Sequence, residues 1–189
     1  MTGGVEVRQE TGARDSEEEI TAAVVAADPR VVAVFAAGCA ERVIQQFTSS
    51  RGGDPDRADD VEVLVDAVER LWDLAASAES FGATVPLLEA FRELHGEDVL
   101  VDTEDIIAFE AVVTALHATQ YRATGDPTAA LACAHVIRTA MWMFDQNSPG
   151  SDRHGAEVAR QREVLASGAV PAALVRAQDI AIGREWALE

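Results

Sequence analysis

The stretch EAVVTALHATQYRATGDPTAALACAHVIRTAMWMFDQ, residues 110–146, decides the fold. It contains two long, largely apolar segments separated by Gly125, Asp126 and Pro127. Glycine commonly ends a helix, aspartate caps the start of the next one, and proline is tolerated at a first helical position. The stretch therefore predicts a central αα-hairpin of two antiparallel helices.

Each helix of this hairpin carries one histidine. Counting outwards from the turn at residues 125–126 places His117 and His135 at the same height. Residues three or four apart share a helix face, which brings further polar side chains into line with the histidines. Buried polar groups normally satisfy one another, and such contacts fix the register of the helices. We therefore expect a core polar network, consisting of His117, His135, Glu110, Arg138 and Tyr121.

A metal site and an acid–base site are alternative interpretations of the same polar stripe. The chain has no Glu-x-x-His, His-Glu-x-x-His or Cys-x-x-Cys motif, which are common arrangements of metal ligands. Cys39 and Cys133 lie in apolar helical runs, where a thiol usually behaves as a small buried hydrophobe. We therefore expect no bound metal, no cofactor and no cysteine nucleophile.

Helix signals recur along the rest of the chain. Asp28-Pro29 and Asp54-Pro55 each predict a helix start, and apolar spacing predicts further helices over residues 61–78, 85–95, 157–167 and 171–189. The segment EDVLVD, residues 97–102, is the one short strand candidate. We expect an all-α, single-domain bundle of about seven or eight helices over residues 16–189, preceded by a disordered acidic tail over residues 1–15.

Charge limits the classes of partner. The chain has 33 acidic and 15 basic residues, all of the latter arginine, and a net charge of −18. Such a charge repels nucleic acid and anionic membranes, and the longest apolar run is too short to span a bilayer. The absence of lysine excludes lysine nucleophiles. Because the first residues contain no apolar stretch and the two cysteines suit a reducing compartment, we expect a cytoplasmic protein.

Two clusters of acids are candidates for contacting a basic partner protein. One lies in HGEDVLVDTEDI, residues 95–106, and the other in the segment from 54 to 60. An alternative is that these acids only solvate the surface or cap helices. The candidate partner-binding residues are Asp98, Asp102, Asp105, Asp56, Asp59 and Asp60.

A magnesium-dependent enzyme is the alternative function. Acids recur at three- or four-residue intervals in the helix over 61–79, as in all-α nucleotide pyrophosphohydrolases, namely at Glu62, Asp66, Glu69 and Asp73. Those enzymes pair two such motifs on neighbouring helices. Glu89 and Glu93 do not supply a matching second motif, so a solvated acidic face with Arg70 as a partner explains the same pattern.

Three segments in chain order resemble known bacterial proteins: VFAAGCAERVIQQF (34–47), LVDAVERLWDLA (64–75) and ALHATQYRATGDPTAALACAHVIRTAMWM (115–143). They are similar to immunity proteins of polymorphic toxin systems and to a related uncharacterised all-α family. Cys39-Ala40-Glu41-Arg42 is the most compact shared part, whereas Gln45-Gln46 stands where these families tend to have Leu-Pro. The resemblance covers roughly residues 30–145. It implies a cytoplasmic protein that binds and blocks a toxin, and it implies no catalytic residue.

Glu41 and Arg42 follow a long apolar run, so they either emerge at the edge of the bundle or pair inside it, and we expect a buried pair. Together these patterns predict a non-enzymatic protein that binds a basic protein such as a toxin. The magnesium-dependent enzyme and self-association into a homo-oligomer remain open alternatives.

Overall fold

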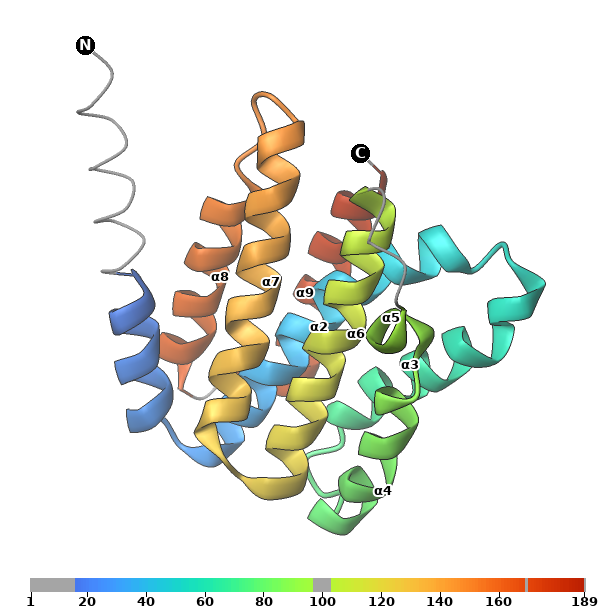
Figure 1. Cartoon of the computed structure of the whole chain (residues 1–189). Coiled ribbons are helices and arrows are strands. Elements are labelled where there is room, and N and C mark those ends of the chain that lie inside the picture. Colours follow the sequence, from blue (N-terminus) through green and yellow to red (C-terminus); the bar gives the residue numbers. More distant parts are fainter. Residues whose placement is uncertain (1–15, 97–102, 169, 189) are drawn as a thin grey trace.

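A computed structural model describes residues 16–96, 103–168 and 170–188 (Figure 1). These residues form helices and connecting turns and include no strand, so the prediction of an all-α bundle is confirmed. A helix over residues 16–26 comes first. The others are α2 (Pro29–Arg51), the 3₁₀ turn η1 (Pro55–Arg57), α3 (Ala58–Leu71), α4 (Ala78–Glu89), α5 (Arg92–His95), α6 (Thr103–Thr124), α7 (Pro127–Asn147), α8 (Arg153–Ser167) and α9 (Ala172–Leu188).

Helix α2 lies at the centre of the bundle and contacts α3, α6, α7, α8 and α9. Every residue from 32 to 44 is buried, which fits a helix that is apolar on all sides. Small residues on α2 and α9 let the helices approach closely. At Gly183 of α9, for example, a Cβ would lie 2.7 Å from the carbonyl oxygen of Arg42. Any polar side chain in this part of α2 must therefore find its partners inside the protein.

The predicted hairpin is formed by α6 and α7, which lie side by side in front of α2 in Figure 1. Gly125 takes a φ of 73° at the turn, and its N–H donates to the carbonyl oxygen of Tyr121 at 2.7 Å. The side chain of Asp126 accepts from the N–H of Thr128 and so caps α7. The Tyr121 hydroxyl also donates to the Pro29 carbonyl oxygen, which fixes the hairpin against the start of α2.

The middle of the chain differs from the sequence prediction. The helix expected over residues 61–78 ends at Leu71, and the one expected over 85–95 is two helices, α4 and α5. Asp73 accepts from the N–H of Ala75 in the intervening turn, and Ser77 then caps α4. Pro86 lies inside α4 and does not start a helix. Local hydrogen bonds of Asp73 and Ser77 thus override the apolar pattern.

The helix over residues 16–26 packs along the bundle through buried Ile20 and Val24. The expected tail over residues 1–15 and the strand candidate over 97–102 lie outside the described residues. Within the described ranges, no helix combines the length and apolar character needed to cross a bilayer.

Candidate functional site

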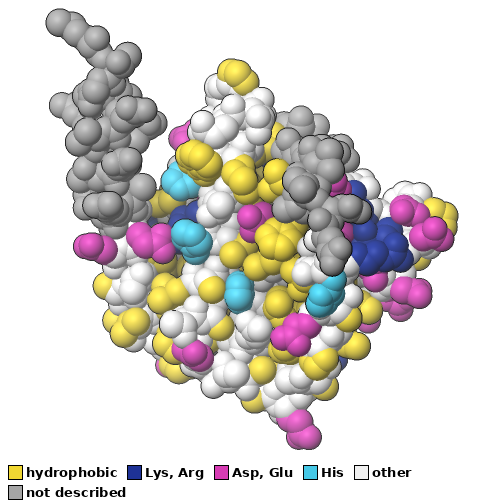
Figure 2. Space-filling view, viewed as in Figure 1, with side chains coloured by type: hydrophobic (Ala, Val, Ile, Leu, Met, Phe, Trp, Pro, Cys, Tyr) yellow, Lys and Arg dark blue, Asp and Glu magenta, His cyan; other side chains and the backbone are white. Residues whose placement is uncertain are grey.

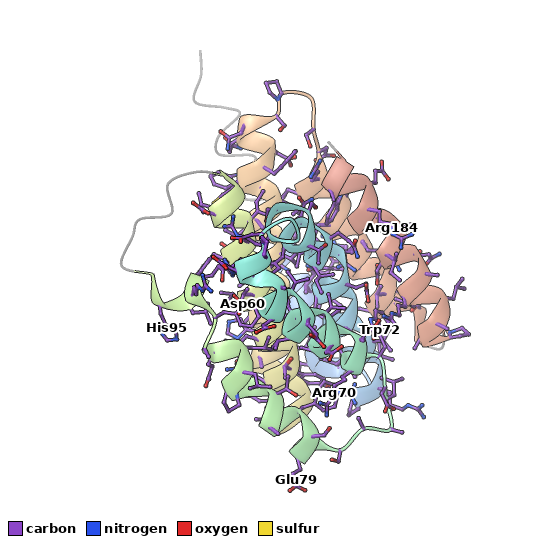
Figure 3. The ribbon with its side chains drawn as sticks, turned by 90° about the vertical axis from the view of Figure 1, so that its right-hand side faces the viewer. Asp60, Arg70, Trp72, Glu79, His95 and Arg184 are labelled. Atoms are coloured by element: carbon purple, nitrogen blue, oxygen red, sulfur yellow. The ribbon has the colours of Figure 1, made fainter. Side chains whose placement is uncertain are left out.

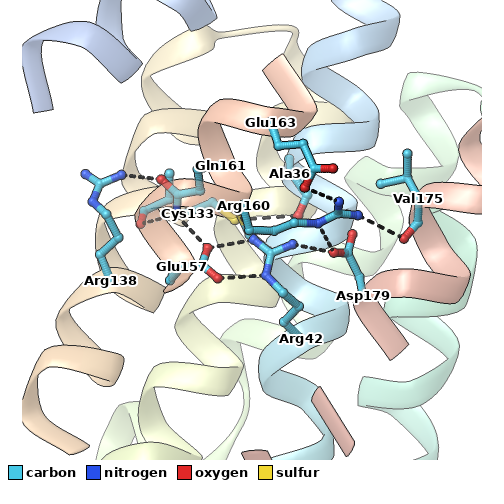
Figure 4. Close-up of polar contacts among 12 residues, drawn as sticks. Ala36, Arg42, Cys133, Arg138, Glu157, Arg160, Gln161, Glu163, Val175 and Asp179 are labelled. Carbon is cyan, nitrogen blue, oxygen red and sulfur yellow. Dashed lines mark hydrogen bonds and ion pairs between the residues drawn. The ribbon is translucent and has the colours of Figure 1, made fainter. Parts of the chain in front are cut away.

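Arg42 on α2 lies in a buried cluster of charged residues (Figure 4). Its guanidinium donates to both carboxylate oxygens of Glu157 on α8, at 2.7 and 2.6 Å, and to Asp179 on α9 at 2.9 Å. Burial alone would lower the pKa of Arg42, but the charges of Glu157 and Asp179 outweigh burial and raise this pKa well above its ordinary value. Arg42 is therefore a permanently charged link between three helices.

A second arginine continues the cluster towards the surface. Arg160 donates to the same Asp179 oxygen at 2.8 Å and to Glu163 at 2.8 Å. The other oxygen of Asp179 is buried without a hydrogen bond to the described residues, and it faces Gly38 of α2. A Cβ at Gly38 would lie 2.4 Å from that oxygen. The glycine therefore makes room for the carboxylate.

Gln161 continues the cluster in the opposite direction. Its amide nitrogen donates to Glu157 at 2.7 Å, and its oxygen accepts from Arg138 of α7 at 2.5 Å. Arg138 in turn donates to Glu17 of the N-terminal helix at 2.5 Å. Because each of these carboxylates accepts from an arginine, the cluster acts as a structural clamp that joins α2, α7, α8, α9 and the N-terminal helix.

Within the described chain, no hydrogen bond or ion pair joins the five residues predicted to form a core polar network. The prediction of a shielded His135 is wrong, because its side chain is 65% exposed and the nearest carboxylate, Glu17, is 3.8 Å away. His117 is partly buried and contacts Gln120 of its own helix at 2.9 Å. The hairpin brings the two helices together, but the rotation of α7 about its own axis turns His135 towards solvent.

The other three members of that set lie in separate places. Tyr121 bonds to the start of α2, and Arg138 joins the buried arginine cluster. Glu110 is partly buried, and its carboxylate forms no hydrogen bond with the described residues. Burial raises the pKa of Glu110 to about 7. The sequence placed polar residues on the hairpin correctly, but their partners come from helices that are remote in the chain.

Glu41 and Arg42 are both buried, as expected, but they do not pair with each other. Consecutive residues of a helix point in different directions, so neighbouring side chains meet different partners. The Glu41 carboxylate accepts from Trp72 Nε1 at 2.7 Å and from Arg176 Nε at 3.2 Å. Burial raises the pKa of Glu41 above its ordinary value, although these two donors oppose that effect.

Two of the acids predicted to bind a partner are already engaged inside the chain. Asp105 accepts from Arg51 at 2.5 Å, and Asp60 accepts from Arg57 at 2.7 Å. Both arginines also approach Glu93, so this group ties together α2, η1, α3, α5 and α6. Asp105 and Asp60 therefore serve the packing of these elements first.

The remaining predicted acids lie elsewhere. Asp98 and Asp102 are outside the described residues, whereas Asp56 and Asp59 are exposed. Asp59 begins a line of exposed carboxylates at three- and four-residue spacing along the outer side of α3. We call this line the acidic stripe, and it consists of Asp59, Glu62, Asp66 and Glu69. Figure 3 is viewed from this side of the molecule, with α3 in front.

A cleft of about 280 Å³ adjoins one end of the acidic stripe, between α2, α3 and α9. Its apolar walls include Ile44, Val65 and Val68. Its polar side chains are Glu41, Gln45, Thr48, Glu69, Arg176 and Arg184. Glu69 therefore belongs both to the stripe and to the cleft. Figure 3 shows Trp72 and Arg184 on this side of the molecule.

The described interior holds more buried arginines than buried acids. The buried arginines of the described chain are Arg42, Arg57, Arg138, Arg153 and Arg160. The buried acids are Glu41, Glu157 and Asp179. This buried set carries a formal charge of +2. Because the whole chain has a net charge of −18, all other residues together carry −20. On the face seen in Figure 2, acidic side chains are scattered widely, whereas arginines show in few places.

Metal-binding and thiol chemistry find little support in the geometry. Among the described side chains, no group of three or more His, Cys, Asp or Glu residues is close enough to hold a metal ion. Both cysteines are buried, and burial raises the pKa of Cys133 well above its ordinary value. A thiol with a raised pKa is a poor nucleophile at neutral pH.

The candidate site is thus an acidic stripe on α3 that ends at a cleft lined by both carboxylates and guanidinium groups. No family model, no curated protein and no solved structure gives a significant match to this chain.

Proposed function

We propose that this chain is a non-enzymatic cytoplasmic protein that binds a basic protein through the acidic stripe, in the manner of an immunity protein that blocks a toxin. The observation that carries the proposal is the acidic stripe itself. Asp59, Glu62 and Asp66 are exposed and form no ion pair with the described arginines. Their negative charge is therefore available to a partner.

The distribution of arginines supports the same proposal. Because the chain buries more arginines than acids, its surface is more negative than its composition alone indicates. Surfaces of one sign attract partners of the opposite sign over distances of about 10 Å at 0.1 M salt, and they raise the rate of association. A basic toxin domain fits such a surface, and nucleic acid does not.

The magnesium-dependent enzyme gains no comparable support. Glu62, Asp66, Glu69 and Asp73 lie along one exposed side of the chain, and no described acid from a neighbouring helix joins them in a group able to hold a metal ion. Phosphoryl chemistry with magnesium needs carboxylates that converge on the ion. We therefore do not propose that activity.

The experiment pairs the purified chain with the protein encoded by the adjacent gene and measures association by stopped flow at 0.01 and 0.1 M NaCl. The test variant carries Asp59→Asn, Glu62→Gln and Asp66→Asn. The control variant carries Glu79→Gln, Glu89→Gln and Glu185→Gln, which remove the same charge from exposed positions elsewhere. We expect the test variant to associate about three- to tenfold more slowly at low salt, and the control variant to stay within twofold of the wild type.

Protection is measured in parallel. Cells that produce the neighbouring protein should grow when they also produce the wild-type chain, and growth should be reduced with the test variant. A neighbouring product that does not bind, or equal rates for the two triple variants, would overturn the proposal.

A further inference from the structure

The cleft between α2, α3 and α9 contains a carboxylate with unused hydrogen-bonding capacity. Glu41 is 4% exposed, and one of its oxygens accepts from both Trp72 and Arg176. Its other oxygen accepts no hydrogen bond from the described residues and is not fully enclosed by the protein. Because Glu41 lines the cleft, a donor that enters the cleft can approach this oxygen.

Arg176 occupies this cleft but is held loosely. Its Nε is 3.2 Å from Glu41, its Nη2 is 3.8 Å from Glu69, and its guanidinium carbon is 5.9 Å from the centre of the Trp72 ring. The corresponding contacts of Arg42 in the core are 2.6 to 2.9 Å. Arg176 is also 32% exposed. Two carboxylates and an aromatic face thus surround a cation that satisfies them incompletely.

We propose that this cleft receives one basic side chain, a guanidinium or an ammonium group, from the basic partner protein. The cationic group takes the position beside Glu41 and Glu69 that Arg176 now holds, and Arg176 moves aside towards solvent. The inference rests on the proposed function, because that function supplies the basic partner.

The surroundings of the cleft favour a cation over an anion. The acidic stripe of α3 leads into the cleft at Glu69 and attracts positive charge towards it. The apolar walls formed by Ile44, Val65 and Val68 suit the methylene stem of an arginine or lysine side chain. Arg184 is the feature that would instead suit an anion, so the experiment includes an anionic probe.

The experiment follows the three tryptophan indole N–H resonances by NMR during titration with acetylated, amidated tri-arginine. Trp72 donates its indole N–H to Glu41, whereas Trp142 on α7 and Trp186 on α9 do not line this cleft. We expect the Trp72 resonance to shift with saturation and the other two to stay in place. An acetylated, amidated tri-glutamate peptide should leave all three unchanged.

Two variants make opposite predictions. Arg176→Ala should tighten tri-arginine binding about three- to tenfold, because it removes the competing cation. Glu69→Gln should weaken binding about two- to fivefold, as expected for one exposed ion pair. Arg70→Ala and Glu79→Gln are the matched controls, since they change the net charge equally at exposed positions outside the cleft.

The outcomes separate this inference from the proposed function. The cleft is not a cation site if the Trp72 resonance does not shift with tri-arginine, if the tri-glutamate peptide shifts it, or if Arg176→Ala behaves like Arg70→Ala. Any of these results would overturn the cleft inference even if the acidic stripe still controls association with the partner. If tri-arginine binds as described but the neighbouring protein does not, the cleft inference stands and the proposed partner is wrong.

Discussion

The partly buried carboxyl group of Glu110 makes stability depend on pH. Burial raises its pKa in the folded protein to about 7, whereas in the unfolded chain it ionises near 4.5. Between these values the unfolded chain releases a proton that the folded protein retains. The stability of the fold therefore decreases as the pH rises from about 4.5 to about 7, and this contribution is constant above that range.

Glu110→Gln should remove this dependence. We expect the unfolding free energy of the variant, relative to that of the wild type, to increase by about 1–2 kcal/mol from pH 5 to pH 8. This is less than the full pKa shift implies, because water reaches the carboxyl group. Urea unfolding of both proteins at the two pH values measures the difference. An equal difference at pH 5 and pH 8 would contradict the prediction.

Removal of the Arg42 side chain should destabilise the protein strongly, because two buried carboxylates depend on it. Arg42→Met leaves Glu157 and Asp179 buried with fewer partners, and the loss of one member of a buried ion pair costs about 3–5 kcal/mol. Arg42→Lys should cost less but still destabilise, since an ammonium group cannot make the two parallel bonds to Glu157. Chemical unfolding measures both variants, and exposed Arg70→Met should stay within about 0.5 kcal/mol of the wild type.

At the scale of elements, the contact between α2 and α9 depends on glycine. Alanine is normally favoured over glycine inside a helix by roughly 1 kcal/mol. Gly38→Ala should nevertheless destabilise the protein by about 1–3 kcal/mol, because the new methyl group would clash with Asp179. Gly82→Ala, inside α4 with no atom within 4 Å of the new Cβ, should stabilise it. Thermal unfolding should therefore give opposite signs for the two variants, and equal signs would refute the packing assigned to Gly38.

Sequence reasoning succeeded where the signal and the structure are local. Asp126 and Gly125 form the turn of the hairpin through contacts within a few residues of themselves, so their types and spacing sufficed. The end of α3 at Leu71 was missed because LWDLAASA continues an apolar helical pattern. The short-range bond of Asp73 ended the helix all the same.

Sequence reasoning failed where the partner is remote. Arg42 bonds to Glu157 and Asp179, which lie 115 and 137 residues further along the chain, and no local pattern indicates such a pairing. The one trace is the presence of Glu157 and Gln161, four residues apart, on the buried side of α8. The exposure of His135 was likewise set by how α7 rotates against its neighbours, which a single sequence does not specify.

At the scale of the whole molecule, the excess of negative charge opposes folding. Self-repulsion destabilises a compact chain with a net charge of −18, and salt screens it as the Debye length falls from about 30 Å at 0.01 M to about 10 Å at 0.1 M. We expect the melting temperature at pH 8 to rise by a few degrees over this range. The triple variant Asp59→Asn, Glu62→Gln, Asp66→Asn should show a smaller rise. Calorimetry measures both, and a melting temperature that falls with salt would show that surface ion pairs outweigh repulsion.

The long reach of Arg42 also sets the order in which the protein can assemble during synthesis. Helix α2 emerges from the ribosome well before the carboxylates that neutralise its guanidinium, which lie on α8 and α9, 115 and 137 residues further along the chain. Until those helices arrive, the central helix has a charge that it cannot bury. The core around Arg42 can therefore close only after α8 and α9 are made. Folding should be slow for a helical protein, since it depends on contacts of long sequence separation.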